Sequence, residues 1–186
     1  MKTVATATVP MTVAEYARLP ESGRPTELVR GEVMEMNPPT PRHGQVCSKA
    51  VRILGTFADE RHLGHVISND SGVITERDPD TVRGADVAFY SFQKIPAGPL
   101  PGGYLDVPPD LIVEVFSPSD RWTQVLGKAA EYLAAGVSVV CVLDPRDETA
   151  TECFPDRPPV TRSRDETISF PEILPEWTAT VREFFE

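Results

Sequence analysis

The chain has 186 residues, of which 40% are hydrophobic and 25% charged, and its formal net charge at pH 7 is −10. This length and balance fit one globular domain with a sizeable core, and the excess of acids argues against tight, non-specific binding of nucleic acid, because phosphate contacts normally come from Lys and Arg. The three cysteines, Cys47, Cys141 and Cys153, form no CxxC pair, so they indicate neither a disulfide framework nor a cysteine zinc site.

Residues 1–10 are expected to form a flexible leader ahead of a single domain at 11–186. The leader has one lysine and no apolar core, so it lacks the pattern of a secretory signal, and the chain has no apolar span of 18 residues. Together with the unpaired cysteines, these features predict a cytoplasmic protein without a membrane partner.

The first elements predicted after the leader are a short helix and a hairpin. Thr12 followed by Glu15 has the form of a capping box, which predicts a helix that ends before Pro20. In the range 27–36, polar and apolar residues alternate around Arg30-Gly31, which predicts a β-hairpin with one solvated face.

The longest predicted helix covers residues 43–63, and Gly64 is expected to close it. Its polar side carries basic residues, for which a solvated face is favoured over a DNA-contacting face, because charged helix exteriors are common. The helix is inferred from apolar residues at helical spacing: Val46, Ala50, Ile53, Leu54, Phe57 and Leu63.

Two short strands are predicted at 65–68 and 72–76, around a turn at 69–72. A third strand at 82–90 is apolar except for an acid near its start, Asp86. The segment 91–109 is rich in Pro and Gly and is expected to be a surface loop near the mouth of a site.

The segment 110–119 contains an apolar run that predicts a strand buried on both faces, yet Glu114 interrupts it. A buried carboxylate requires a metal, a cation or a proton as its partner. If this strand pairs with the Asp86 strand, the two acids lie about 5 Å apart, which suits a divalent cation. The alternatives are a structural salt bridge for Glu114 and a strand-edge position for Asp86.

A helix is predicted at 121–135, because its apolar residues recur at helical spacing. Lys128 on this helix can return to the acid pair, although by itself it is an ordinary surface lysine. Further strands are predicted at 137–143, 149–154 and 167–170, with a helical turn at 181–185. This order predicts an α/β fold with a mixed sheet.

At these residues the chain resembles the PD-(D/E)xK nuclease superfamily, and more closely the Uma-two family of bacterial endonucleases. The resemblance extends from about Tyr16 to Asp144. It is carried by Asp86 and by five short segments: Glu27-Leu28-Val29-Arg30-Gly31-Glu32-Val33, Pro38-Pro39-Thr40-Pro41-Arg42-His43, Pro109-Asp110-Leu111-Ile112-Val113-Glu114-Val115, Ser117-Pro118-Ser119 and 128–137.

The resemblance implies a restriction-endonuclease-like fold and a metal-dependent endonuclease. Asp86 and Glu114 would hold Mg²⁺ or Mn²⁺, with the carbonyl of Val115 as a third ligand. Lys128 would position the nucleophile or neutralise the transition state, since the family places on the following helix the lysine that usually stands two residues after the acid.

Two further residues have open roles. Glu27, at the family's upstream acid position, would hold metal-bound water or a second ion, or is a solvated hairpin residue. His43 matches a family histidine and would polarise a phosphate or water, although a hydrogen bond at the start of the helix is favoured.

The chain departs from the family pattern at Ala85, Gln124 and Cys141, and of these Gln124 is expected to weaken the orientation of Lys128. The partner implied is nucleic acid, specifically DNA, and a homodimer is expected; phosphate contacts would come from a local basic face or from the second subunit. The alternative function is a catalytically silent binding or assembly protein on the same scaffold.

Overall fold

A computed structural model describes residues 9–20 and 23–186, so the predicted leader falls almost entirely outside the described residues. Eight strands form the main sheet: β1 (Thr26–Val29), β2 (Glu32–Glu35), β3 (Gly64–Glu76), β4 (Thr81–Ser91), β5 (Leu111–Val115), β6 (Val139–Asp144), β7 (Thr149–Phe154) and β8 (Arg157–Arg162). The other elements are α1 (Val13–Tyr16), α2 (Pro41–Glu60), α3 (Trp122–Ala134), β9 (Thr167–Ser169), β10 (Thr178–Thr180) and the 3₁₀ helix η1 (Val181–Phe184).

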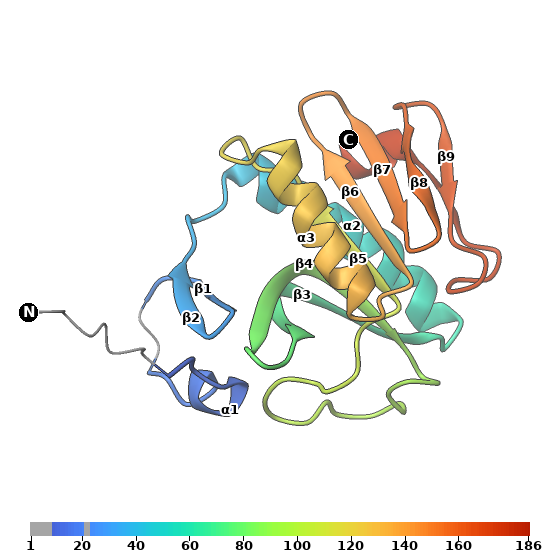
Figure 1. Ribbon diagram of the computed structural model, residues 1–186. Helices are drawn as coiled ribbons and strands as arrows, with labels where there is room; N and C mark the ends of the chain where they lie inside the picture. The colour runs from blue at the N-terminus through green and yellow to red at the C-terminus, as the bar shows by residue number, and fades with distance from the viewer. Residues whose placement is uncertain (1–8, 21–22) are drawn as a thin grey trace, which may run out of the picture.

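The main sheet is mixed and runs in the order β2-β1-β4-β5-β6-β7-β8, with β3 paired to β4 outside this path (Figure 1). β5 and β6 are parallel, and the other neighbouring strands are antiparallel. The expected α/β fold with a mixed sheet is therefore confirmed.

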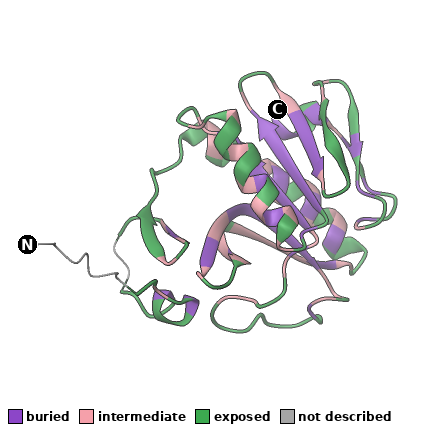
Figure 2. Ribbon diagram, in the orientation of Figure 1, coloured by how far each residue is buried: buried purple, intermediate pink, exposed green. Residues whose placement is uncertain are grey.

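Two helices cover opposite faces of the sheet (Figure 1). Because side chains alternate along a strand, Leu111 and Val113 of β5 join the core cluster that contains α2, while Ile112 joins the cluster that contains α3. All five residues of β5 are buried, as the apolar run predicts. The central strands are buried, whereas β2 and β8 at the edges are exposed (Figure 2). Glu114 is two residues after Ile112, so its side chain lies on the same face of the sheet, toward α3.

The core on the α2 side continues into the C-terminal segment. The β9–β10 hairpin and η1 add to it the buried side chains Ile168, Phe170, Trp177 and Phe184. The predicted turn at 181–185 is thus present as η1, while β8 and β10 were not predicted. β8 carries Pro158 and Pro159, which suit an edge strand because a proline cannot donate to a sheet.

The predicted capped helix and the predicted hairpin are confirmed. Thr12 caps α1 in a capping box with Glu15, and β1 and β2 form a hairpin whose turn residues Arg30 and Gly31 have φ angles of 51° and 81°. Among the described residues, no helix is long and apolar enough to cross a membrane.

The ends of the long helix were predicted wrongly. α2 begins at Pro41, one residue after its N-cap Thr40, whose side chain accepts a hydrogen bond from the His43 N–H. It ends at Glu60, and Gly64 is the first residue of β3, so this glycine does not close the helix. The apolar periodicity persists beyond the helix because Leu63 still packs against the core.

The turn predicted at 69–72 is also wrong. β3 is continuous across it and pairs with β4 throughout, with a bulge between Ser68 and Ser71. Asn69 and Asp70 adopt the positive φ angles of 72° and 52° that favour Asn and Asp. The tendency of Asn and Asp to adopt positive φ angles is compatible with a bulge as well as with a turn. Pairing with a distant strand decides which of the two forms.

Candidate active site

The site lies at a gap in the sheet beside β4. β3 pairs with one edge of β4. β1 and β5 share the other edge: Leu28 of β1 pairs with Val82 of β4, and β5 pairs with β4 only from Val87 onward. In the described chain, no strand pairs with 83–86 on this second edge. The backbone groups there need other partners, since buried N–H and C=O groups are costly to leave unpaired.

Side chains supply those partners. The Gly84 N–H donates to Glu27 Oε1 at 3.0 Å, and the Gly84 carbonyl accepts from Lys128 Nζ at 2.8 Å and from the Tyr132 hydroxyl at 3.2 Å. Lys128 and Tyr132 are four residues apart on α3 and so share one helix face. The backbone of Gly84 therefore connects one hairpin residue with two residues of α3.

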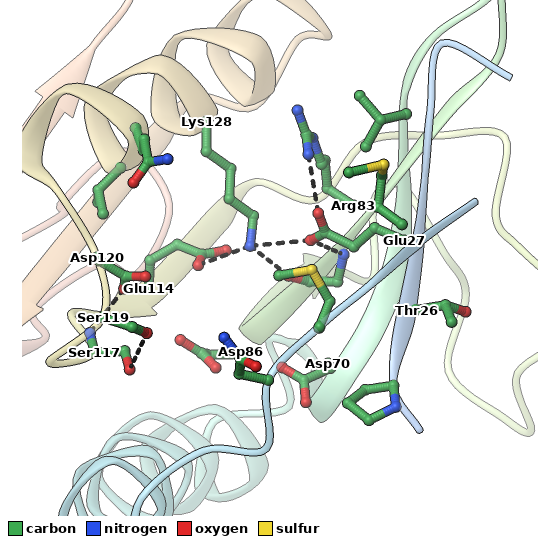
Figure 3. A pocket seen from close by; sticks show the side chains of 18 of the residues that line it. Thr26, Glu27, Asp70, Arg83, Asp86, Glu114, Ser117, Ser119, Asp120 and Lys128 are labelled. Atoms are coloured by element: carbon green, nitrogen blue, oxygen red, sulfur yellow. Dashed lines mark hydrogen bonds and ion pairs between the residues drawn. The ribbon is translucent and has the colours of Figure 1, made fainter. Parts of the chain in front are cut away.

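Lys128 is the cation at the centre of this arrangement (Figure 3). Its ammonium lies 3.0 Å from Glu114 Oε2 and 3.3 Å from Glu27 Oε1. Burial by itself would lower the pKa of Lys128, but the carboxylates of Glu114, Glu27 and Asp86 raise it. Lys128 is therefore a fixed positive charge at neutral pH.

Glu114 is only 8% exposed. The Tyr132 hydroxyl donates to its Oε1 at 2.9 Å, and Lys128 donates to its Oε2. Burial raises the pKa of Glu114 to about 7; Lys128 opposes this rise and the charge of Asp86 adds to it. One lysine does not fully offset the loss of hydration at this carboxylate.

A second cation, Arg83, lies on the α3 side of Glu27. It donates to Glu27 Oε2 at 2.9 Å and to both carboxylate oxygens of Glu131 at 2.7 and 2.8 Å. The two-point contact with Glu131 is the strong form of an arginine–carboxylate pair. Arg83 thereby joins β4, the hairpin and α3.

Asp86 lies across the gap from Glu114. The pairing of β4 with β5 ends at Val87 and Val113, and Asp86 comes directly before it, close enough for its charge to raise the pKa of Glu114. The Val115 N–H donates to Asp86 Oδ2 at 2.7 Å, and His43 Nε2 lies 3.3 Å from the same oxygen. Burial alone would lower the pKa of His43, but the adjacent Asp86 raises it above its ordinary value.

The bulge in β3 adds a third acid beside Asp86 (Figure 3). Asp70 is exposed as a residue, but its carboxylate lines the pocket, where lost hydration and the charge of Asp86 raise its pKa. A Cβ at residue 84 would lie 3.1 Å from the Asp70 carbonyl oxygen and 3.2 Å from its Cβ. Gly84 thus allows the bulge to approach β4 closely.

The donors in the pocket fit a divalent cation. Asp70, Asp86 and Glu114 supply carboxylate oxygens, the ligands preferred by Mg²⁺ and Mn²⁺, and each carboxylate has more lone pairs than the hydrogen bonds described above occupy. Val115, whose carbonyl is the remaining expected ligand, also lines the pocket. A different set of donors, His43, Cys47 and Asp86, lies close enough together to hold an ion, with one ligand atom from each within 4.8 Å of the others.

Comparisons with known proteins identify the family of the chain and support its fold. The family described as "Uma2: Putative restriction endonuclease" matches residues 13–182. The chain belongs to the Uma2 family. Among solved structures, it is similar to "a putative nuclease belonging to DUF820" from Anabaena variabilis ATCC 29413, with a TM-score of 0.82 and 19% identity over 95% of this chain and 98% of that chain. That similarity supports the fold. No curated protein matched the chain.

In this Uma2 chain, the residues singled out from the sequence lie around one pocket of roughly 1070 Å³. They come from β1, the start of α2, β4, β5 and α3, and they are Glu27, His43, Asp86, Glu114, Val115 and Lys128. The loop 92–109 contributes no lining residue, so its expected place at the mouth is wrong. It packs elsewhere, with Tyr104 stacked on Tyr16 of α1.

Four residues in or next to the pocket were not singled out from the sequence. Tyr132 could have been found from its place four residues after Lys128, and Cys47 from its place four residues after His43. Asp70 and Arg83 gave no such local signal, since they reach the site through the bulge and through a contact 56 residues apart in sequence.

The departures from the family pattern leave the charged groups in place. Ala85 and Cys141 are buried in the core. Gln124 lines the pocket, and its side-chain oxygen accepts a hydrogen bond from the Arg121 N–H at the start of α3. Lys128 is oriented instead by Glu114, Glu27 and the Gly84 carbonyl.

Proposed function

We propose that this chain is a metal-dependent endonuclease that hydrolyses phosphodiester bonds, with Asp86, Glu114 and the Val115 carbonyl holding Mg²⁺ or Mn²⁺. The observation that carries the proposal is the hydrogen bond from the Val115 N–H to Asp86 Oδ2 at 2.7 Å, which holds Asp86 beside the strand of Glu114, with the Lys128 ammonium 3.0 Å from Glu114. Two acids that can hold a cation and a lysine that can neutralise charge come together from three elements, which suits metal-assisted hydrolysis of a phosphodiester. The family description supports the same reaction class.

Each residue has a role that follows from its contacts. When bound, the cation would polarise the phosphate and acidify a water molecule. Lys128 would neutralise charge that develops on the phosphate, and Glu27 holds Lys128 in position. Tyr132 orients Glu114, and His43 orients Asp86.

DNA is the proposed substrate class, because the family is described as one of restriction endonucleases. The pocket lining is rich in acids, in keeping with the net charge of −10, so phosphate contacts away from the cation need basic side chains from elsewhere. A homodimer that supplies such side chains remains a prediction.

A cleavage assay on double-stranded DNA, single-stranded DNA and RNA, each with Mg²⁺ or Mn²⁺, tests the proposal. Asp86→Asn, Glu114→Gln and Lys128→Met should each lower the rate by at least about 100-fold, the scale of one removed charge-stabilising group. Asp59→Asn is the matched control, because Asp59 is exposed on α2 outside the pocket lining.

Wild-type rates in the three site variants would contradict the proposed site. If the folded wild-type chain cleaves none of the substrates with either ion, the silent binding or assembly protein becomes the better description.

A further inference from the structure

His43 and Cys47 lie on one face of the first turns of α2. They are four residues apart, so their side chains project in the same direction. Cys47 Sγ lies 3.4 Å from His43 Nδ1, and His43 Nε2 lies 3.3 Å from Asp86 Oδ2. One helix therefore presents an imidazole and a thiol toward a buried carboxylate of β4.

The spacing of these donors is close to that of a metal site. With bonds of about 2.0–2.3 Å, two ligands of a tetrahedral zinc ion lie about 3.3–3.7 Å apart. In this cluster, one ligand atom from each of His43, Cys47 and Asp86 lies within 4.8 Å of the other two. A small rotation of the side chains would shorten the distances between the ligand atoms to those around a zinc ion.

The types of donor atom in this cluster indicate which metal ion would bind. Nitrogen, sulfur and carboxylate oxygen together suit Zn²⁺, whereas Mg²⁺ prefers oxygen alone. The carboxylates of Asp70 and Glu114 add negative charge nearby, which favours a cation at this position. The other two cysteines, Cys141 and Cys153, are buried in β6 and β7 and do not belong to this cluster.

We propose that His43, Cys47 and Asp86 form a zinc-binding site, with a fourth position open to water from the pocket. The thiol proton passes to solvent when the sulfur binds the ion. Because Asp86 also belongs to the site proposed for Mg²⁺ or Mn²⁺, zinc and the harder ion compete for this carboxylate. Only the competition rests on the proposed function; zinc binding stands by itself.

Cobalt(II) titration of the metal-free full chain tests the binding site, because a cobalt–thiolate bond gives a charge-transfer absorption band. The wild-type chain should take up one Co²⁺ with this band, and Zn²⁺ should displace it. Cys47→Ser should abolish the band and weaken zinc binding by at least about 100-fold, beyond the loss typical of an indirect metal contact. Cys153→Ala is the matched control, in which a cysteine outside the cluster is removed, and it should keep the band.

Absence of the band in the wild-type chain, or its persistence in Cys47→Ser, would overturn the zinc site. Melting curves test the competition: one equivalent of Zn²⁺ should suppress stabilisation by Mn²⁺ in the wild-type chain but not in Cys47→Ser. An Mn²⁺ shift that zinc leaves unchanged would overturn the shared use of Asp86. Neither measurement depends on cleavage, so an inactive nuclease could still bind zinc at this site and give the same two results.

Discussion

The two halves of the pocket neutralise their acids differently. In the paired half, formed by β1, α3 and neighbouring residues of β4 and β5, the carboxylates of Glu27, Glu114 and Glu131 contact the cations Lys128 and Arg83. In the acidic half, formed by the β3 bulge, β4 and the start of α2, Asp70 and Asp86 lie beside His43 and Cys47. Among the described residues, Asp86 forms its ion pair with His43, and Asp70 forms none.

The two halves therefore differ in role: one stabilises the fold, and the other holds acids that have no lysine or arginine partner in the part of the chain that the structure describes. The paired half closes the gap in the sheet with carboxylates that each contact a cation, so its contacts stabilise the fold without any ligand. The acidic half concentrates carboxylates without a lysine or arginine in contact, which is unfavourable until a cation arrives. Glu114 joins the two halves, since both Lys128 and Asp86 shift its pKa.

Lys128→Met should give the largest effect on stability. It leaves Glu114 and Glu27 without their shared cation, at a cost of about 3 kcal/mol, the low end for a broken buried pair because the lysine side chain is 21% exposed. Urea unfolding measures this, with Lys49→Met as the control outside the pocket lining. Lys128→Met combined with Glu114→Gln should recover part of the loss, and a loss in the double variant equal to the sum of the two single losses would contradict the pairing.

Asp86→Asn tests the acidic half. The metal-free variant should be as stable as the wild type or more so, because one of two neighbouring acids is gone while an oxygen remains to accept from the Val115 N–H. With Mn²⁺ at 100 times its Kd, the wild type should gain about 2.7 kcal/mol and the variant almost nothing. Glu131→Gln in the paired half should keep the metal-induced gain. Equal metal-induced gains in the wild type and Asp86→Asn would contradict a metal site in the acidic half.

The pH dependence of stability tests Glu114, where the halves meet. A carboxyl whose pKa is higher in the folded than in the unfolded chain favours folding below its ordinary value, near 4.5, and this contribution disappears as the pH rises through about 7. The metal-free wild type should therefore lose stability relative to Glu114→Gln between pH 5 and pH 7.5, on the order of 2 kcal/mol. Unfolding free energies at the two pH values measure this, with exposed Glu60→Gln as the control. Parallel profiles for wild type and Glu114→Gln would contradict the raised pKa.

Tyr132→Phe should give the smallest effect. The ring and its packing remain, while Glu114 Oε1 and the Gly84 carbonyl lose a donor. Lys128 still contacts both groups, so the expected cost is about 1 kcal/mol. The loss of a hydrogen bond should also raise the pKa of Glu114 further, moving the pH-dependent loss of stability upward. A variant with an unchanged pH profile would show that the hydroxyl is not a partner of Glu114.

Much of the fold and part of the site followed from local patterns. An apolar run bounded by prolines identified β5, and a single acid within it identified Glu114 as a residue in need of a partner. Helical spacing on 121–135 placed Lys128 on a helix that follows a strand and folds back over the sheet. These patterns are readable because burial repeats with the period of each element.

The tertiary structure decided the remainder. Whether residues 69–72 turn or bulge depends on pairing with β4, and this pairing alone brings Asp70 beside Asp86. The gap that Lys128, Tyr132 and Glu27 fill exists because β1 and β5 share one edge of β4. A chain segment carries its own periodicity, but strand register and unpaired edges are set by contacts between segments far apart in sequence.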